Sequence, residues 1–220
     1  MVFPKKLRLP DCFRTADNED IMNAKTKKIA LFAALAAILI IMAFTPVGYL
    51  RVGVVEITFI MIPVIICAAA CGPLFGGFMG LLFGITSFVQ CFGLSTFGSM
   101  LFTINPYFAF ILCIVPRVLF GVFAGLIYNG LAKTKVPSLV NDVITMLSSA
   151  MLHTIMFVGL LMLFYGRSEY INSFGNGFFA IIWTIVGING LVEWAVCATV
   201  GAAILKAVQF FIEKPKKKEE

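Results

Sequence analysis

Three ionisable side chains lie deep inside long apolar segments, where a charge is costly unless it has a partner or a function. They are Arg117, His153 and Glu193. Each lies about 11 to 16 residues from the predicted outer end of its segment. At a rise of about 1.5 Å per helical residue, that places all three roughly 16 to 24 Å below the outer surface. Because their depths are similar, we expect them to meet inside the protein.

Arg117 allows two interpretations. It could form an ion pair with Glu193 that fixes one helix against another. Alternatively, it could face a cavity and bind the carboxylate of a ligand, because the planar guanidinium fork matches carboxylate geometry. His153 could likewise be a buried core histidine or part of the same site.

A metal site is not expected. The sequence has one histidine, which disfavours a histidine-based site. The six cysteines show no metal-binding spacing; they are Cys12, Cys67, Cys71, Cys91, Cys113 and Cys197. We therefore expect neither a metal nor another cofactor.

Further polar and aromatic side chains stand near the predicted outer ends of the segments. Tryptophan at this depth is typical of the membrane interface, whereas the amides have no such explanation. Amides and aromatics that converge on one cavity would suit a small polar ligand. The predicted substrate-binding residues are Gln90, Asn105, Arg117, His153, Trp183, Asn189 and Glu193.

Motifs of the common enzyme classes are missing. The sequence has no phosphate-binding glycine loop with lysine, no HExxH and no serine–histidine–aspartate pattern. The net charge of +6 lies in the tails and one short loop, which argues against nucleic-acid binding. We expect a protein that is not an enzyme.

The composition requires lipid as the surrounding solvent. Hydrophobic residues make up 60% of the chain and charged residues 13%, with a mean hydropathy of +1.00. Soluble domains usually carry about 25% charged residues. The apolar runs must satisfy their own backbone hydrogen bonds, and they are too long and too evenly apolar for barrel strands. The sequence predicts an all-α integral membrane protein.

Proline, glycine and polar clusters divide the chain into six predicted transmembrane helices. A polar, uncharged stretch at 92–105 separates the third from the fourth. Residues 1–24 form a polar N-terminal extension that we expect to be disordered, residues 25–212 the membrane domain, and residues 213–220 a charged tail. The six helices are predicted at 28–44, 56–70, 74–91, 106–131, 139–165 and 177–211.

Lysines predict the orientation. They cluster before the first helix, between the fourth and fifth, and after the sixth. With six spans, all three clusters lie on one side, and the positive-inside rule places both termini in the cytoplasm. The protein is expected in the plasma membrane. The lysines are Lys25, Lys27, Lys28, Lys133, Lys135, Lys206, Lys214, Lys216, Lys217 and Lys218.

Small residues at four-residue spacing predict a close helix contact. Gly76, Gly80 and Gly84 form a small-xxx-small ladder in the third helix. Without a hydrophobic driving force in lipid, such ladders let two helix backbones approach closely. We expect a packing face here.

Four stretches together resemble the substrate-binding components of energy-coupling factor transporters, the vitamin uptake systems of prokaryotes. The resemblance extends over about residues 25–211. The stretches are residues 29–35 (IALFAAL), 45–50 (TPVGYL), 57–87, which includes 71–77 (CGPLFGG), and 115–121 (VPRVLFG).

The resemblance implies a six-helix protein without its own ATPase, which binds a vitamin near the outer side. It implies as partners a transmembrane coupling subunit and two ATPase subunits, in a membrane environment. Small residues of the first helix would dock on the coupling subunit, here Ala30, Ala33, Ala34 and Ala37. The first outer loop, residues 49–55, would act as a gate, with Tyr49, Leu50 and Arg51 as its candidate residues.

The pantothenate-type carriers are the most similar subgroup, and Arg117 could receive the pantothenate carboxylate. Carriers of cobalamin and of pyridoxine-type vitamins are also similar, so other vitamins remain alternatives. Two other classes compete with transport. A membrane enzyme would need a catalytic set near an interface, and none is visible. A membrane assembly protein would scatter its outer polar residues rather than gather them.

Overall fold

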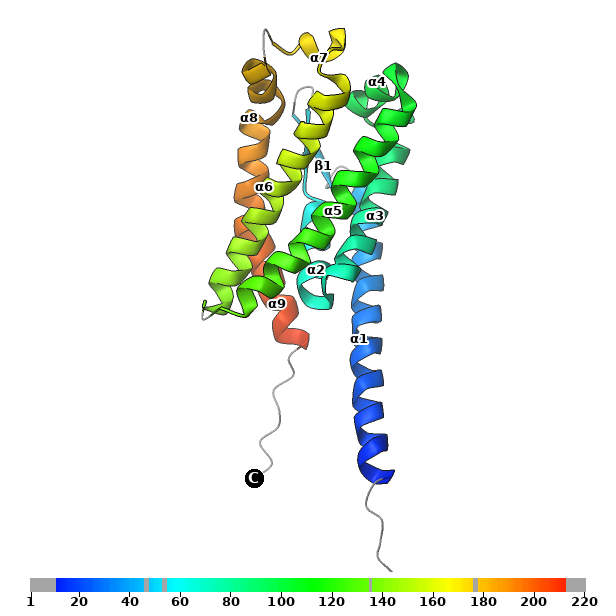
Figure 1. Ribbon diagram of the computed structural model, residues 1–220, viewed down its shortest axis with the longest axis vertical. Helices are drawn as coiled ribbons and strands as arrows, with labels where there is room; N and C mark the ends of the chain where they lie inside the picture. The colour runs from blue at the N-terminus through cyan, green and yellow to red at the C-terminus, as the bar shows by residue number, and fades with distance from the viewer. Residues whose placement is uncertain (1–10, 46–47, 53–54, 135, 176–177, 213–220) are drawn as a thin grey trace, which may run out of the picture.

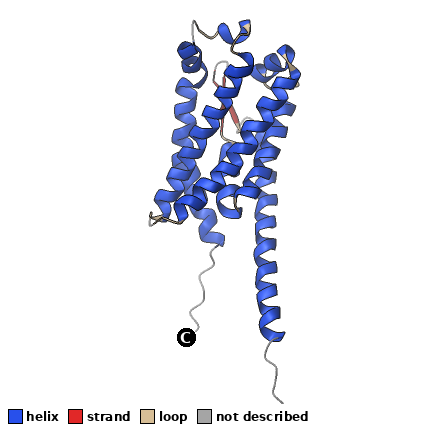
Figure 2. Ribbon diagram, in the orientation of Figure 1, coloured by secondary structure: helices blue, strands red, loops and turns tan. Residues whose placement is uncertain are grey.

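The computed structural model describes residues 11–45, 48–52, 55–134, 136–175 and 178–212. Figures 1 and 2 show a helical bundle with one small β-hairpin near its centre. The elements are α1 (Asp11–Ala43), β1 (Tyr49–Val52), β2 (Val55–Thr58), α2 (Met61–Cys71), α3 (Pro73–Gln90), α4 (Thr96–Ile104), α5 (Pro106–Ala132), α6 (Ser138–Tyr165), α7 (Glu169–Asn172), α8 (Phe178–Val196), a π-helical turn (Cys197–Gly201) and α9 (Ala202–Ile212).

Five helical segments of the described chain are long and apolar enough to cross a membrane. They are Lys25–Ala43, Pro73–Gln90, Pro106–Ala132, Ser138–Tyr165 and Gly190–Phe210. The remaining expected span, predicted at 56–70, corresponds to α2, which has 11 residues. A helix of that length extends only about 16 Å, against a hydrocarbon core of about 30 Å.

Helix α2 is short, and the other elements enclose it. Every residue of α2 except Ala70 is buried. Gly72, with φ of 105°, ends the helix, and its N–H donates to the Ala68 carbonyl. Pro73 then begins α3 at a position where its missing N–H has no cost. The tight turn reverses the chain so that α2 lies inside the bundle as part of its core (Figure 1).

The closest helix pair is α3 with α5, as the glycine ladder predicts. A Cβ at Gly76 would overlap the carbonyl oxygen of Gly121, and one at Gly80 that of Arg117. At Gly84 it would lie 2.9 Å from the Cys113 oxygen. These contacts confirm the predicted packing face. They also place the backbone of Arg117 directly opposite Gly80 of α3.

The first outer connection differs from the expectation. The sequence predicts a loop at 49–55 and a helix from 56, whereas the structure has an antiparallel hairpin in which Tyr49 pairs with Thr58 and Val52 with Val55. The second helix begins only at Met61. β-Branched residues such as Val55 and Thr58 favour a strand, and two paired strands satisfy backbone groups that a loop would leave open.

Three further elements were not predicted in this form. Helix α4 occupies most of the stretch 92–105, capped by Ser95, whose side chain accepts from the Gly98 N–H. Helix α1 already begins at Asp11, inside the segment expected as an extension. The last predicted helix, 177–211, is interrupted by the π-helical turn Cys197–Gly201.

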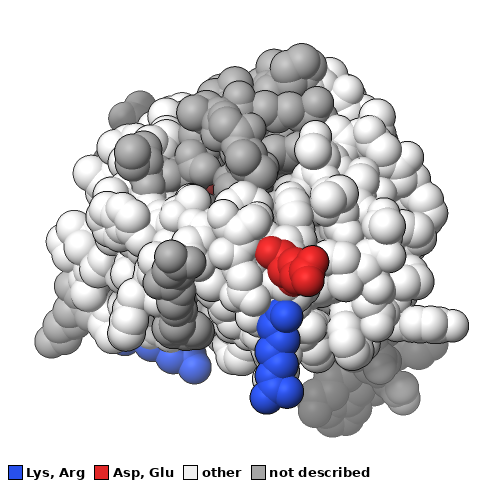
Figure 3. All heavy atoms as spheres, turned by 90° about the horizontal axis from the view of Figure 1, so that it is seen from above, with Lys and Arg blue, Asp and Glu red and all other residues white. Residues whose placement is uncertain are grey.

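The two ends of the bundle differ. The N-terminal part of α1 and the end of α9 lie at one end, while α4 and α7 lie at the other (Figure 1). Seen from the α4 and α7 end, the described surface is almost entirely uncharged (Figure 3). Both described ends of the chain therefore lie at the end of the bundle away from α4 and α7.

Candidate substrate-binding pocket

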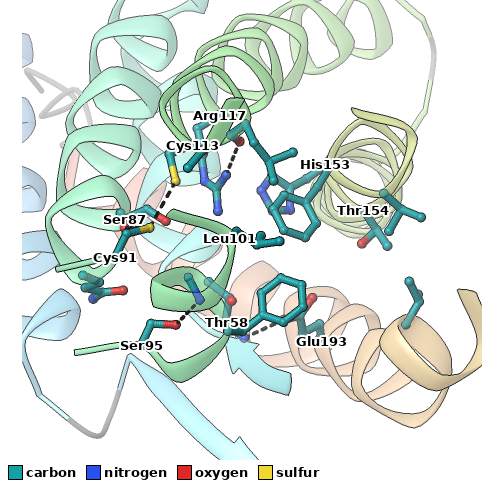
Figure 4. A pocket seen from close by; sticks show the side chains of 18 of the residues that line it. Thr58, Ser87, Cys91, Ser95, Leu101, Cys113, Arg117, His153, Thr154 and Glu193 are labelled. Atoms are coloured by element: carbon teal, nitrogen blue, oxygen red, sulfur yellow. Dashed lines mark hydrogen bonds between the residues drawn. The ribbon is translucent and has the colours of Figure 1, made fainter. Parts of the chain in front are cut away.

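A cavity of about 130 Å³ lies between β2, α4 and the helices α3, α5, α6 and α8. One buried water requires roughly 10–15 Å³ measured in the same way, so the cavity has room for a small molecule. Most of its wall is apolar, and a few polar groups project into it. Figure 4 shows Arg117 and His153 on one side and Thr58 and Glu193 on the other.

Arg117 is the buried cation of the pocket, only 8% exposed. Its Nη1 donates to the Leu112 carbonyl at 2.6 Å, while its buried Nε has no hydrogen-bond partner. The guanidinium carbon lies 5.3 Å from the ring centre of Phe83 and 5.1 Å from that of Phe157. Two aromatic faces thus offset part of its desolvation, but they supply no negative charge.

Glu193 lines the same cavity, but among the described residues it forms no ion pair with Arg117, so the structure does not support the first of the two interpretations of Arg117. Its Oε1 instead accepts the backbone N–H of Thr58 at 2.5 Å. This bond ties helix α8 to the hairpin. Beside it, Trp194 Nε1 donates to Thr154 Oγ1 at 3.2 Å, which ties α8 to α6.

His153 lies among aromatic rings on the α6 side of the pocket. Its ring centre is 5.1 Å from that of Phe120 and 5.9 Å from that of Phe83. It is 7% exposed, and its Nε2 is buried without a hydrogen-bond partner. His153 is therefore both a packed core residue and part of the pocket wall, so the two interpretations do not exclude each other.

Gln90 is the fourth predicted residue that lines the cavity. It is 6% exposed, and its Nε2 donates to the Ala43 carbonyl at 2.5 Å. That bond joins the end of α1 to α3. Arg117, His153, Glu193 and Gln90 are thus brought together, although they come from four different helices.

Two of the other predicted binding residues, Asn105 and Trp183, do not line the cavity. Asn105 caps α5, with its side-chain oxygen accepting from the N–H groups of Tyr107 and Phe108. Trp183 is 71% exposed and does not line the cavity. The side chain of Asn189 lies outside the described residues, as do those of the gate residues Tyr49, Leu50 and Arg51, whose backbone forms β1.

Residues 27–205 match the family described as the substrate-specific component of ECF transporters. The chain belongs to this family. It is also 31% identical over 119 residues to the pantothenate transporter PanT of Leuconostoc mesenteroides subsp. mesenteroides, a match that covers 51% of this chain and 56% of that protein. The chain thus matches about half the length of this relative.

As a substrate-specific component, the protein is a multi-pass membrane protein of a transporter family. The face of α1 on which the resemblance places the docking alanines is open. Ala30, Ala33, Ala34 and Ala37 are all exposed, whereas Leu35 and Leu39 face the core. The structure therefore leaves this small-residue face uncovered.

Several pocket residues of this substrate-specific component were not predicted. A periodic signal was present. Ser87 lies three residues before Gln90 and four before Cys91, and Cys113 lies four residues before Arg117 on α5. Residues three or four apart share a helix face. The missed residues with polar or sulfur-containing side chains are Thr58, Ser87, Cys91, Ser95, Cys113 and Thr154.

Proposed function

We propose that this chain is the substrate-binding membrane subunit of an ECF-type transporter and captures pantothenate at the outer face. Uptake is then driven by a separate coupling module with ATPases. One observation carries the proposal: Arg117 is a buried cation at a cavity, with an unpartnered Nε and no carboxylate among the described residues to pair with it.

A buried charge without a counter-charge is unstable. The effective penalty for desolvating an ion in a protein is several kcal/mol, and an anionic partner with good hydrogen bonds offsets it. Of its five N–H donors, the Arg117 guanidinium uses one, toward Leu112. A ligand carboxylate would accept from the remaining donors and would complete the ion pair that the protein itself does not form.

The candidate vitamins differ in how well they meet this requirement. Pantothenate carries a carboxylate for Arg117 and, at its other end, hydroxyl groups that Glu193 and Gln90 could bind across the pocket. A corrinoid such as cobalamin is many times larger than the cavity. Pyridoxine carries no carboxylate and would leave Arg117 without a counter-charge. The similarity to PanT supports the same choice.

The proposed topology has six membrane segments with both termini in the cytoplasm. Helix α2 is the sixth segment, enclosed by the others rather than exposed to lipid along its length. Lys25, Lys27 and Lys28 of α1 and Lys206 of α9 then lie on the cytoplasmic side, and the pocket, the hairpin and α4 lie toward the outside. The exposed alanine face of α1 docks on the coupling subunit, because small residues allow close helix approach in lipid.

The test is a thermal-shift screen of the detergent-purified protein against a panel of vitamins. A ligand that binds only the folded state at about 100 times its Kd stabilises that state by about 2.7 kcal/mol. We expect pantothenate to raise the melting temperature. If a folded protein responds to none of the vitamins, the vitamin-binding function is wrong and the assembly role gains support.

Arg117→Met then tests the carboxylate role directly. Hydrogen bonds to charged groups contribute about 1.5–3 kcal/mol each, so we expect pantothenate affinity to fall roughly 10- to 100-fold or more. The matched control is Arg167→Met, because Arg167 is exposed and lies outside the pocket. Equal affinity of folded Arg117→Met and wild-type protein would exclude Arg117 as the carboxylate receptor.

A further inference from the structure

Two cysteine sulfurs meet in the wall of the pocket. Cys91 directly follows α3 and Cys113 lies on α5, and their Sγ atoms are 3.8 Å apart. Their side chains are 5% and 6% exposed, and both line the cavity (Figure 4). Both are reduced. A small reagent that enters the cavity would therefore encounter two thiols at once.

The separation of the two sulfurs distinguishes between two kinds of thiol chemistry. A disulfide requires the sulfurs to approach to about 2.05 Å. A single atom such as trivalent arsenic, bonded to both sulfurs at about 2.3 Å, a typical length for such bonds, has a pyramidal S–As–S angle of about 100° and holds the sulfurs about 3.5 Å apart. The observed distance of 3.8 Å lies much nearer to the second arrangement than to the first.

The backbone favours the same arrangement. Helices α3 and α5 are already in tight contact, since a Cβ at Gly84 would lie 2.9 Å from the carbonyl oxygen of Cys113. They have no room to close further near this level. Capture of such an atom between the sulfurs needs an approach of only about 0.3 Å, which side-chain rotation can supply, whereas a disulfide needs about 1.7 Å.

The number of available ligands narrows the choice of that atom. Within the described residues, no group of three or more histidine, cysteine or acidic side chains is placed to hold a metal ion. A closed four-ligand site is thus not available. The pair suits a thiophilic acceptor that needs only two protein sulfurs, such as a trivalent arsenical.

We propose that Cys91 and Cys113 form a dithiol site in the pocket wall that captures trivalent arsenicals. With an arsenoxide, R–As=O, two As–S bonds form and the As=O bond is lost. The two thiol protons leave with the oxygen as one water molecule, and arsenic stays trivalent. The adduct occupies the cavity one helical turn from Arg117. That it then excludes a carboxylate ligand rests on the proposed function.

The experiment uses the full-length protein in detergent with Cys12, Cys67, Cys71 and Cys197 changed to Ser or Ala, so that Cys91 and Cys113 remain. The probe is phenylarsine oxide, and the readout is intact mass. We expect one phenylarsenical per chain, removed by dithiothreitol but retained in a matching concentration of the monothiol 2-mercaptoethanol. Adding Cys91→Ser or Cys113→Ser, with folding checked by thermal melting, should abolish the monothiol-resistant adduct.

No adduct in the folded protein, or a monothiol-resistant adduct that persists in both single variants, would overturn the proposal. If the four-site background does not fold, the wild-type adduct is mapped by tandem mass spectrometry, where an arsenic bridge between the peptides of Cys91 and Cys113 is required. Protection by pantothenate is measured separately. An adduct without protection leaves the dithiol site standing and counts against the proposed substrate.

Discussion

A methyl group at Gly80 would show how strictly the packing of α3 on α5 positions the cation of the pocket. A Cβ there would overlap the carbonyl oxygen of Arg117 and lie 2.9 Å from its carbonyl carbon. Carbon atoms in favourable contact are about 3.5–4.0 Å apart. Because the carbonyl oxygen is nearer still, the two helices in Gly80→Ala must separate by about 1 Å or more at the level of Arg117.

This separation acts on stability and on ligand binding together. Overpacking of a close-packed interior costs about 1–3 kcal/mol, so the melting temperature should fall. The guanidinium moves with the backbone of α5 and therefore shifts relative to Thr58 and Glu193 on the other side of the pocket. Losing one charge-assisted hydrogen bond to the ligand costs about 1.5–3 kcal/mol. We expect pantothenate to bind roughly 10- to 100-fold more weakly.

The assay is isothermal titration of the purified protein, with thermal melting alongside. Gly130→Ala is the matched control, because it lies on the same helix as Arg117 and a Cβ there would meet no atom within 4 Å. Alanine is favoured over glycine in a helix by about 1 kcal/mol, so the control should keep its Kd and melt no lower than wild type. If Gly80→Ala behaves like the control, glycine packing does not position Arg117.

Three further predictions follow from individual contacts. Glu193→Ala removes the acceptor of the Thr58 N–H, so hydrogen exchange at that amide should accelerate about 10- to 100-fold; unchanged protection would show that the bond does not hold the hairpin. Ala34→Trp should abolish co-purification with the coupling subunit while ligand affinity is kept. The control Ala195→Trp, at an exposed position of α8, should leave both co-purification and ligand affinity unchanged; a complex that survives Ala34→Trp would show that the docking face lies elsewhere. Tyr165→Phe removes the hydroxyl that lies 2.8 Å from the Asn105 carbonyl and 3.1 Å from that of Leu101, and should lower stability by about 1–3 kcal/mol; an unaltered melting temperature would contradict this.

The sequence predicts the long helices well where the chain marks their ends locally. Helices α3, α5 and α6 begin and end within one residue of the expected positions. Gly72 with Pro73, and Asn105 with Pro106, are start signals that act within a few residues. Such signals need no knowledge of the rest of the fold.

The hairpin and α4 show what local signals leave open. Strand β2 continues into the apolar run of α2, so periodicity alone does not separate strand from helix. The strand exists because β1 pairs with it, and the pattern within residues 55–58 does not reveal this pairing. Ser95 does mark the start of α4, but nine residues inside a polar connection are too few for a confident helix from pattern alone.

The pocket was predictable in part through the cost of burying charge. That cost singled out Arg117 and Glu193, and both line the cavity. Their partners were not predictable, because the partner of Glu193 is a backbone N–H at Thr58, far away in the sequence. Trp183 was assigned to the pocket from its depth, but its helix turns that side chain outward. Depth follows from sequence position, whereas the direction a side chain faces depends on how the helices are rotated.

The π-helical turn at Cys197–Gly201 sets the rotational phase between the two halves of the last membrane segment. Each residue in an α-helix advances the direction of its side chain by about 100°, and a π-turn accommodates one extra residue. If the same residues formed a regular α-helix instead, Glu193 would be turned by about 100° away from Thr58 while Leu205 kept its place in the core. Deleting one residue here should therefore replace the turn by regular α-helix and leave both faces in place. The turn thus lets the pocket half and the core half of one helix face in directions that a regular helix could not combine.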